Sequence, residues 1–167
     1  MSREFEIDKP EVFTVGTIGP VGHRAFFLQC VASGETLTFK VEKFQVALMA
    51  DYLARIVRLS RRPGHLPDLS DIQFGVDLAV DWVVGSIEVS FDEDRELLVL
   101  LLSEAPDESA LGWQARITLT REQAGAFAIR ATQLVESGRP PCPLCSQPLD
   151  PAGHDCPRTN GHRPPIT

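Results

Sequence analysis

The feature that most constrains the fold is a change in hydrophobic periodicity that occurs twice along the chain. Apolar residues first alternate with polar ones, as in half-buried strands, and then recur every three or four residues, as in an amphipathic helix. In the first half the alternating residues are Phe13, Val15, Ala25, Phe27, Val31, Leu37, Phe39 and Val41, and the helical ones are Val46, Met49, Ala50, Leu53 and Val57. Strands followed by a helix predict an α+β domain.

The second half shows the same order. Ala115 lies 78 positions after Leu37, and the following helical pattern keeps this offset. Its apolar residues are Ala124, Phe127, Ala128, Ala131 and Val135. Thr120 and Gln123 have the spacing of a capping box at its start. We therefore predict two pseudo-repeated β-β-β-α units, at about residues 11–62 and 82–137, although amphipathic patterns also resemble one another by chance.

The two units are expected to form an antiparallel sheet or a partly closed barrel that carries two helices, with approximate two-fold symmetry. Additional short strands are possible near Phe5–Ile7 and Ile72–Phe74. This domain would span residues 1–138, and a C-terminal zinc knuckle would occupy residues 139–167. A groove between the units is the natural place for a ligand.

The charge balance limits the partners. A net charge of -7 argues against an electrostatic grip on nucleic acid or an anionic membrane, so a protein or a small anionic ligand is the expected partner. The N-terminus lacks a basic start followed by an apolar run, and the longest apolar run, Leu97–Leu102, falls short of the roughly 20 residues that span a membrane. We therefore expect a cytoplasmic protein with reduced thiols. The sequence indicates no oligomeric state.

Three of the four cysteines lie close together near the C-terminus. Cys142 and Cys145 form a C-x-x-C pair, which places two thiolates on one tight turn, and Cys156 is a third ligand. The fourth ligand is either His154 or His162, and spacing leaves both open. Four such ligands close the coordination shell of a structural zinc ion. A redox-active pair is the weaker alternative, because this pair follows a helix and two prolines instead of opening a helix.

Basic residues elsewhere could bind an anion. His23 and Arg24 lie where a turn leads into a strand, and Arg55, Arg58 and Arg62 follow one another on the first predicted helix. The structural alternatives are a solvent-facing histidine and cations that favour the dipole at a helix C-terminus. No catalytic residue is predicted, because the chain has no P-loop, Rossmann glycine triad or other catalytic motif. Cys30 lies in an apolar strand and is expected to be a core residue.

Three functions are compatible with these features. The first is a non-catalytic cytoplasmic module that binds a protein or ligand and carries a structural zinc site. The second is an enzyme acting on an anionic or phosphorylated metabolite in the cleft between the units, using His23, Arg24 and the arginines of the first predicted helix. The third is nucleic-acid binding through the knuckle, but the segment from Gly138 onward has only three arginines against two aspartates. The first function is preferred, and catalysis is not expected.

The C-terminal run also carries a family resemblance. Gly138–Cys145, Gly153-His154, Cys156-Pro157-Arg158 and Asn160-Gly161 resemble the signature of a bacterial family catalogued as domain of unknown function 3090. Further similar segments are Gly16-Thr17, Arg24, Phe26–Gln29, Leu119-Thr120, Gln123-Ala124 and Pro148–Pro151. The chain departs from the family pattern at Ser146, where glycine is expected, and at His162, where an aromatic residue is expected. The resemblance therefore favours His154 as the fourth ligand and implies no established activity.

Overall fold

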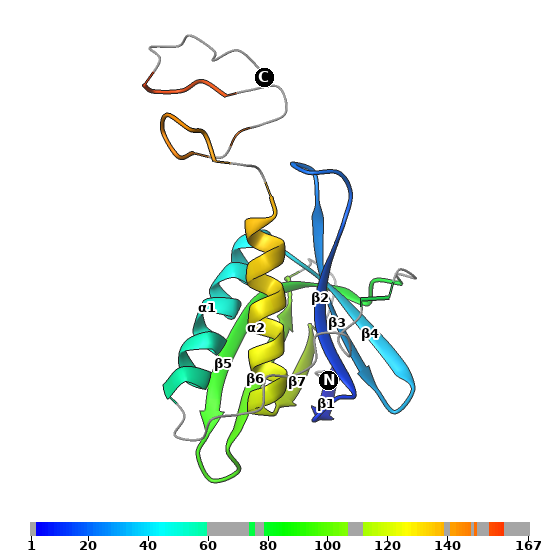
Figure 1. Cartoon of the computed structure of the whole chain (residues 1–167). Coiled ribbons are helices and arrows are strands. Elements are labelled where there is room, and N and C mark those ends of the chain that lie inside the picture. The colour runs from blue at the N-terminus through cyan, green and yellow to red at the C-terminus, as the bar shows by residue number, and fades with distance from the viewer. Residues whose placement is uncertain are drawn as a thin grey trace.

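A computed structural model describes residues 3–59, 74–75, 79–106, 112–138, 141–147, 149 and 154–158 of the chain. Its elements are β1 (Arg3–Asp8), β2 (Val12–Ile18), β3 (Ala25–Ala32), β4 (Glu35–Val41), α1 (Lys43–Leu59), β5 (Trp82–Asp92), β6 (Leu97–Glu104), β7 (Trp113–Leu119) and α2 (Arg121–Glu136). The α+β class is confirmed (Figure 1). The extra strand near Phe5–Ile7 exists as β1, whereas Phe74 belongs to no regular element and Ile72 lies outside the described residues.

The seven strands in the described part of the chain belong to one sheet in the order β1-β7-β6-β5-β4-β3-β2. The sheet is mixed and not antiparallel as predicted, because β4 pairs parallel with β5 and β1 pairs parallel with β7. The parallel pairing of β4 with β5 follows from α1, which connects them. This crossover helix returns the chain to the end of the sheet where β4 begins, so β5 runs in the same direction as β4. The β-β-β-α order occurs twice, but a duplication and its two-fold symmetry stay predictions.

The two helices lie side by side against the sheet, and the core forms between these layers (Figure 1). A Cβ atom added at Gly125 would lie 3.8 Å from Cγ1 of Val57, and one added at Gly138 would lie 2.9 Å from Nζ of Lys43. The helices are therefore antiparallel. Their buried residues include the predicted stripes except Val57 and Val135, which are only half buried. The ring centroids of Phe13 and Phe127 lie 4.9 Å apart. Neither helix in the described part of the chain is long and apolar enough to cross a bilayer.

Helix α2 also covers the outer edge of β2, the last strand of the sheet. The predicted capping box is present, since Gln123 N–H donates to Thr120 Oγ1 and Thr120 N–H donates to Gln123 Oε1. Gln123 Nε2 also donates to the carbonyl of Pro10 at 2.6 Å, and Arg130 Nε donates to the carbonyl of Val15 at 2.7 Å. Burial lowers the pKa of Arg130. These bonds satisfy carbonyl groups at an edge that would otherwise accept another strand.

Part of the segment between α1 and β5 packs on the face of β2–β4 that points away from the helices. Gln29, which is buried, exchanges two hydrogen bonds with Gly75: its Nε2 donates to the carbonyl at 3.1 Å, and its Oε1 accepts from the N–H at 2.7 Å. Phe74 lies over Gly16, where an added Cβ would come within 2.2 Å of the ring. Asp81 accepts from the N–H of Thr38 at 2.8 Å. This segment therefore gives the buried side chain of Gln29 and the N–H of Thr38 their partners.

Candidate metal centre

The metal centre is built on one tight turn after α2. Ser146 N–H donates to the carbonyl of Cys142 at 2.8 Å, and Cys142 N–H donates to the carbonyl of Gln147 at 2.7 Å. Ser146 closes the turn with a φ of 62°, in the left-handed region that favours glycine. The turn therefore brings the two thiols of the C-x-x-C pair to the same side. Figure 1 shows this knuckle beyond the C-terminal end of α2.

Four side chains from the knuckle converge on one point. The ligand atoms of Cys142, Cys145, His154 and Cys156 all lie within 4.8 Å of one another. Cys145 Sγ and His154 Nε2 are 3.2 Å apart. Metal–ligand bonds of about 2.0–2.3 Å give a tetrahedron with edges of roughly 3.3–3.8 Å, so small shifts would bring all four atoms onto one ion. The predicted cysteine ligands are therefore brought together with His154, and His162 lies outside the described residues.

Burial in the knuckle is concentrated on its cysteines. Cys142 and Cys156 are 2% and 1% exposed, and they are the only buried residues among those described in the tail. The four cysteines of the chain are all free thiols. A segment this small has little apolar surface to hold it together, so the convergence of its cysteines and histidine is the feature that a metal ion would stabilise.

The surroundings of the thiols affect their ionisation in opposite directions. Burial disfavours the thiolate of Cys142, but the N–H groups of Leu144 and Cys145 point at its sulfur and together with neighbouring thiols lower its pKa. The N–H of Leu144 lies 3.4 Å from this sulfur. Burial raises the pKa of Cys145, and the nearby Cys156 and Cys142 add to the increase. A cation bound among these groups would favour their deprotonated forms, because metal binding releases thiol protons.

His154 presents one ring nitrogen to the cluster and buries the other. Nε2 faces Cys145, while Nδ1 is buried without a hydrogen-bond partner among the residues that the structure describes. A metal-bound imidazole usually donates its second N–H to a carbonyl, carboxylate or water, so a water at Nδ1 would complete this arrangement. The residue thus fits the role of fourth ligand through Nε2.

Cys30 lies apart from the cluster, as the sequence predicted. It is 1% exposed within β3, and burial raises its pKa to about 12. A thiol in this environment is neither a ligand nor a nucleophile at neutral pH. It therefore offers a natural control for experiments on the other three cysteines.

We expect the Ser146→Gly substitution to raise metal affinity about two- to five-fold. The folded turn holds Ser146 in the left-handed region, which costs a residue with a Cβ on the order of 1 kcal/mol and costs glycine much less. Competition against a chromophoric chelator measures the affinity. Ser146→Ala is the matched control, since it keeps the Cβ and should bind no more tightly than the natural protein. Equal affinities of the two variants would contradict the explanation.

The predicted anion-binding residues are divided between opposite ends of the helix pair. His23 is exposed in the β2–β3 turn, and Arg24 donates to Ser137 Oγ at 3.1 Å, at the C-terminal end of α2. The C-terminal end of α2 lies near the start of α1. Arg55 and Arg58 lie in the last turns of α1, about 18 Å further along the axis of that helix at 1.5 Å per residue. Arg62 lies outside the described residues.

The two described arginines of α1 have local partners. Arg55 forms an exposed ion pair with Asp51, one turn earlier, at 2.8 Å, and Nε of Arg58 donates to the carbonyl of Ala54 at 3.3 Å. The structure therefore does not bring the predicted residues into one anion site. Arg58 near the helix C-terminus fits the dipole explanation.

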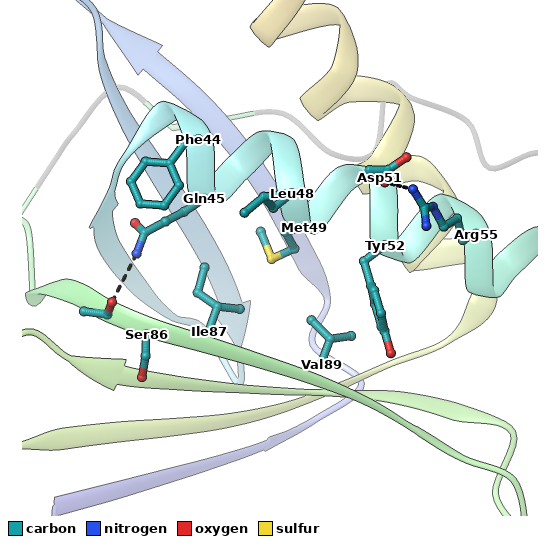
Figure 2. A pocket seen from close by; sticks show the side chains of 11 residues that line it. Phe44, Gln45, Leu48, Met49, Asp51, Tyr52, Arg55, Ser86, Ile87 and Val89 are labelled. Carbon is teal, nitrogen blue, oxygen red and sulfur yellow. Dashed lines mark hydrogen bonds and ion pairs between the residues drawn. The ribbon is translucent and has the colours of Figure 1, made fainter.

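A groove of about 630 Å³ lies between α1 and β5 (Figure 2), and the residues that line it were not predicted from the sequence. Its apolar and aromatic lining residues are Phe44, Leu48, Met49, Tyr52, Ile87 and Val89. It lies between the first and second β-β-β-α units, where a groove was predicted, but among the predicted ligand residues that the structure describes only Arg55 lies on its wall. The available signal was the spacing of Phe44, Leu48 and Tyr52, which places them on one face of the helix outside the buried stripe.

Comparison with known proteins gives one family. The model of a family described as a protein of unknown function, DUF3090, matches residues 5–156. The matched range begins within β1 and ends at the last cysteine of the knuckle, so the sheet, both helices and the metal centre all fall inside it. The predicted resemblance is confirmed. No curated protein matches the chain.

Proposed function

This chain belongs to the DUF3090 family of proteins of unknown function, and we propose that it is a non-catalytic, cytoplasmic binding protein whose C-terminal tail is folded by one structural zinc ion. The observation that carries the proposal is the convergence of Cys142, Cys145, His154 and Cys156, whose ligand atoms lie within 4.8 Å of one another.

The donor set favours zinc. Three thiolates and one imidazole are soft and borderline ligands, and a tetrahedral set of this kind suits Zn²⁺ better than Mg²⁺ or Ca²⁺, which prefer oxygen. Four protein ligands also leave no open position for water or substrate, and this distinguishes a structural zinc site from a catalytic one. Prolines prevent the tail from continuing the preceding helix, so the ion would supply the order that packing does not.

A binding role is supported by the groove between α1 and β5. Its walls are mostly apolar and partly exposed, which is typical of a surface that contacts another protein. An enzyme using His23 and Arg24 together with Arg55 has less support, because these residues lie at opposite ends of the helix pair. Nucleic-acid binding has less support because the chain carries a net charge of -7.

Elemental analysis of protein purified without added metal tests the proposal. We expect one equivalent of zinc per chain. Cys142→Ser removes the most buried ligand of the C-x-x-C pair and should lower the zinc content to about a tenth of an equivalent or less. Cys30→Ala is the matched control, since it also removes a buried cysteine and should keep the full equivalent. Less than about half an equivalent in the natural protein, or full occupancy in Cys142→Ser, would refute a structural zinc site.

A further inference from the structure

Helix α1 has a second apolar stripe besides the one that faces the core. Phe44, Leu48, Tyr52 and Leu59 are between 47% and 83% exposed. They follow one another at four, four and seven residues, a spacing that keeps them on one side of the helix. We call these four residues the outer stripe. Solvated helix faces are normally polar, so an outer stripe of large apolar residues points to contact with another surface.

The groove continues this apolar surface onto the sheet. The pairing of β5 with β6 shifts register between Val84 and Ser86, and beyond this bulge Ile87 and Val89 are only half buried. Figure 2 shows both residues across the groove from Phe44, Leu48 and Tyr52. A helix lying along α1 would therefore contact the outer stripe and this part of β5 together. This is the geometry in which a groove receives an amphipathic helix.

We propose that the occupant is α1 of a second copy of this chain, in an antiparallel, two-fold symmetric dimer. The two ends of the outer stripe, Phe44 and Leu59, are equally far from a midpoint between Asp51 and Tyr52. Antiparallel copies aligned on this point place Phe44 of each copy opposite Leu59 of the other. Such an arrangement is an isologous interface, in which one patch serves both partners.

The charges beside the outer stripe select this arrangement. Asp51 and Arg55 are exposed and lie near the midpoint, with the acid nearer the helix N-terminus. In an antiparallel dimer, Arg55 of one copy lies opposite Leu48 of its partner copy. The apolar stem of this arginine then covers Leu48, and the guanidinium reaches toward Asp51 of the partner copy. In parallel copies like charges would face each other. Electrostatic complementarity thus distinguishes a second copy from an apolar partner of arbitrary sequence.

The contact is expected to be weak. A contact made by one helix face and a neighbouring strand is expected to bury less than the roughly 800 Å² per partner of a standard stable interface, and we expect a dissociation constant on the order of 10 µM. The dimer does not involve the metal ligands, which lie in the tail. Loss of zinc and loss of self-association can therefore be measured separately.

Sedimentation analysis of the zinc-loaded full chain, from about 1 µM to about 500 µM, tests the proposal. We expect the natural protein to pass from monomer to dimer over this range. Leu48→Glu should raise the dissociation constant at least tenfold, because it places a charge in the centre of the contact while keeping a good helix former at an exposed position. Val21→Glu, at an exposed apolar residue of the β2–β3 turn, is the matched control and should dimerise normally.

A charge exchange tests the antiparallel alignment. Asp51→Arg and Arg55→Asp should each be monomeric alone, because identical charges then meet at the midpoint, and an equimolar mixture should form a heterodimer. The exposed ion pair contributes little to folding, so thermal unfolding of both variants should stay close to that of the natural protein. A monomer at every concentration, a dimer that Leu48→Glu leaves intact, or a mixture that associates no better than its components would overturn the proposal.

Discussion

Removing the metal is expected to raise the number of rapidly reacting thiols from none to three, and not to four. In the zinc-bound protein Cys142, Cys145 and Cys156 would all be ligands and slow to react. A strong chelator frees these three, whereas Cys30 stays 1% exposed in β3 with a pKa of about 12. Only the thiolate is nucleophilic, so Cys30 should react only after denaturation. Counting modified thiols by mass spectrometry measures each step.

The same treatment should disorder the tail and leave the body folded. Every residue of the hydrophobic core cluster, including those packed at its margin, comes before Ser137. In small zinc modules the apparent free energy of zinc binding, about 10–16 kcal/mol, also drives folding of the module. The knuckle should therefore lose its ordered structure when the zinc ion is removed. Hydrogen exchange should show faster exchange at Cys142 and Ser146 and unchanged protection in the sheet. A fourth reactive thiol, or faster hydrogen exchange throughout the sheet and helices, would show that folding of the body depends on the metal ion.

The substitution Phe127→Ala should destabilise the body by about 3–5 kcal/mol. Phe127 is fully buried on α2 and contacts Phe13 across the helix–sheet interface, so truncation leaves a cavity between the two layers. Urea denaturation measures the change in the free energy of unfolding. Zinc content should not change under conditions where the variant is folded.

Ile129→Ala is the control for this substitution. Ile129 lies on the same helix but is 37% exposed, and its truncation should cost less than half as much. Similar losses for the two variants would mean that the packing between α2 and β2 contributes little to stability.

The sequence predicted the helices and most strands because their patterns are local. Val46, Met49, Ala50 and Leu53 are buried at the positions that the helical periodicity indicates. Pairing directions were not predictable in this way, because alternation reveals which face of a strand is buried and not which strand lies beside it. The pairing of Phe5 with Ala115 joins strands that are far apart in the sequence. Nothing near β1 in the chain indicates that partner.

The candidate metal site was largely predictable, and the residues that line the groove between α1 and β5 were not. A C-x-x-C pair with a nearby cysteine is chemically specific at short range, but choosing between His154 and His162 needed the family resemblance. Arg24 and Arg55 were assigned to one site because the antiparallel arrangement of α1 and α2 cannot be deduced from either helix alone. The lining of the groove was not predicted because residue spacing does not reveal the register shift of β5 between Val84 and Ser86, beyond which Ile87 and Val89 are only half buried.

The bonds from Gln123 and Arg130 to carbonyl groups beside β2 have a consequence for assembly. Growth of a sheet into a filament requires each molecule to add one neighbour at each of two open edges. In this sheet α2 occupies one side, and the strand at the opposite side, β1, carries Glu4, Glu6 and Asp8. Two molecules that joined through their β1 strands would present their β2 strands outward, where the bonds from α2 oppose the addition of a further strand.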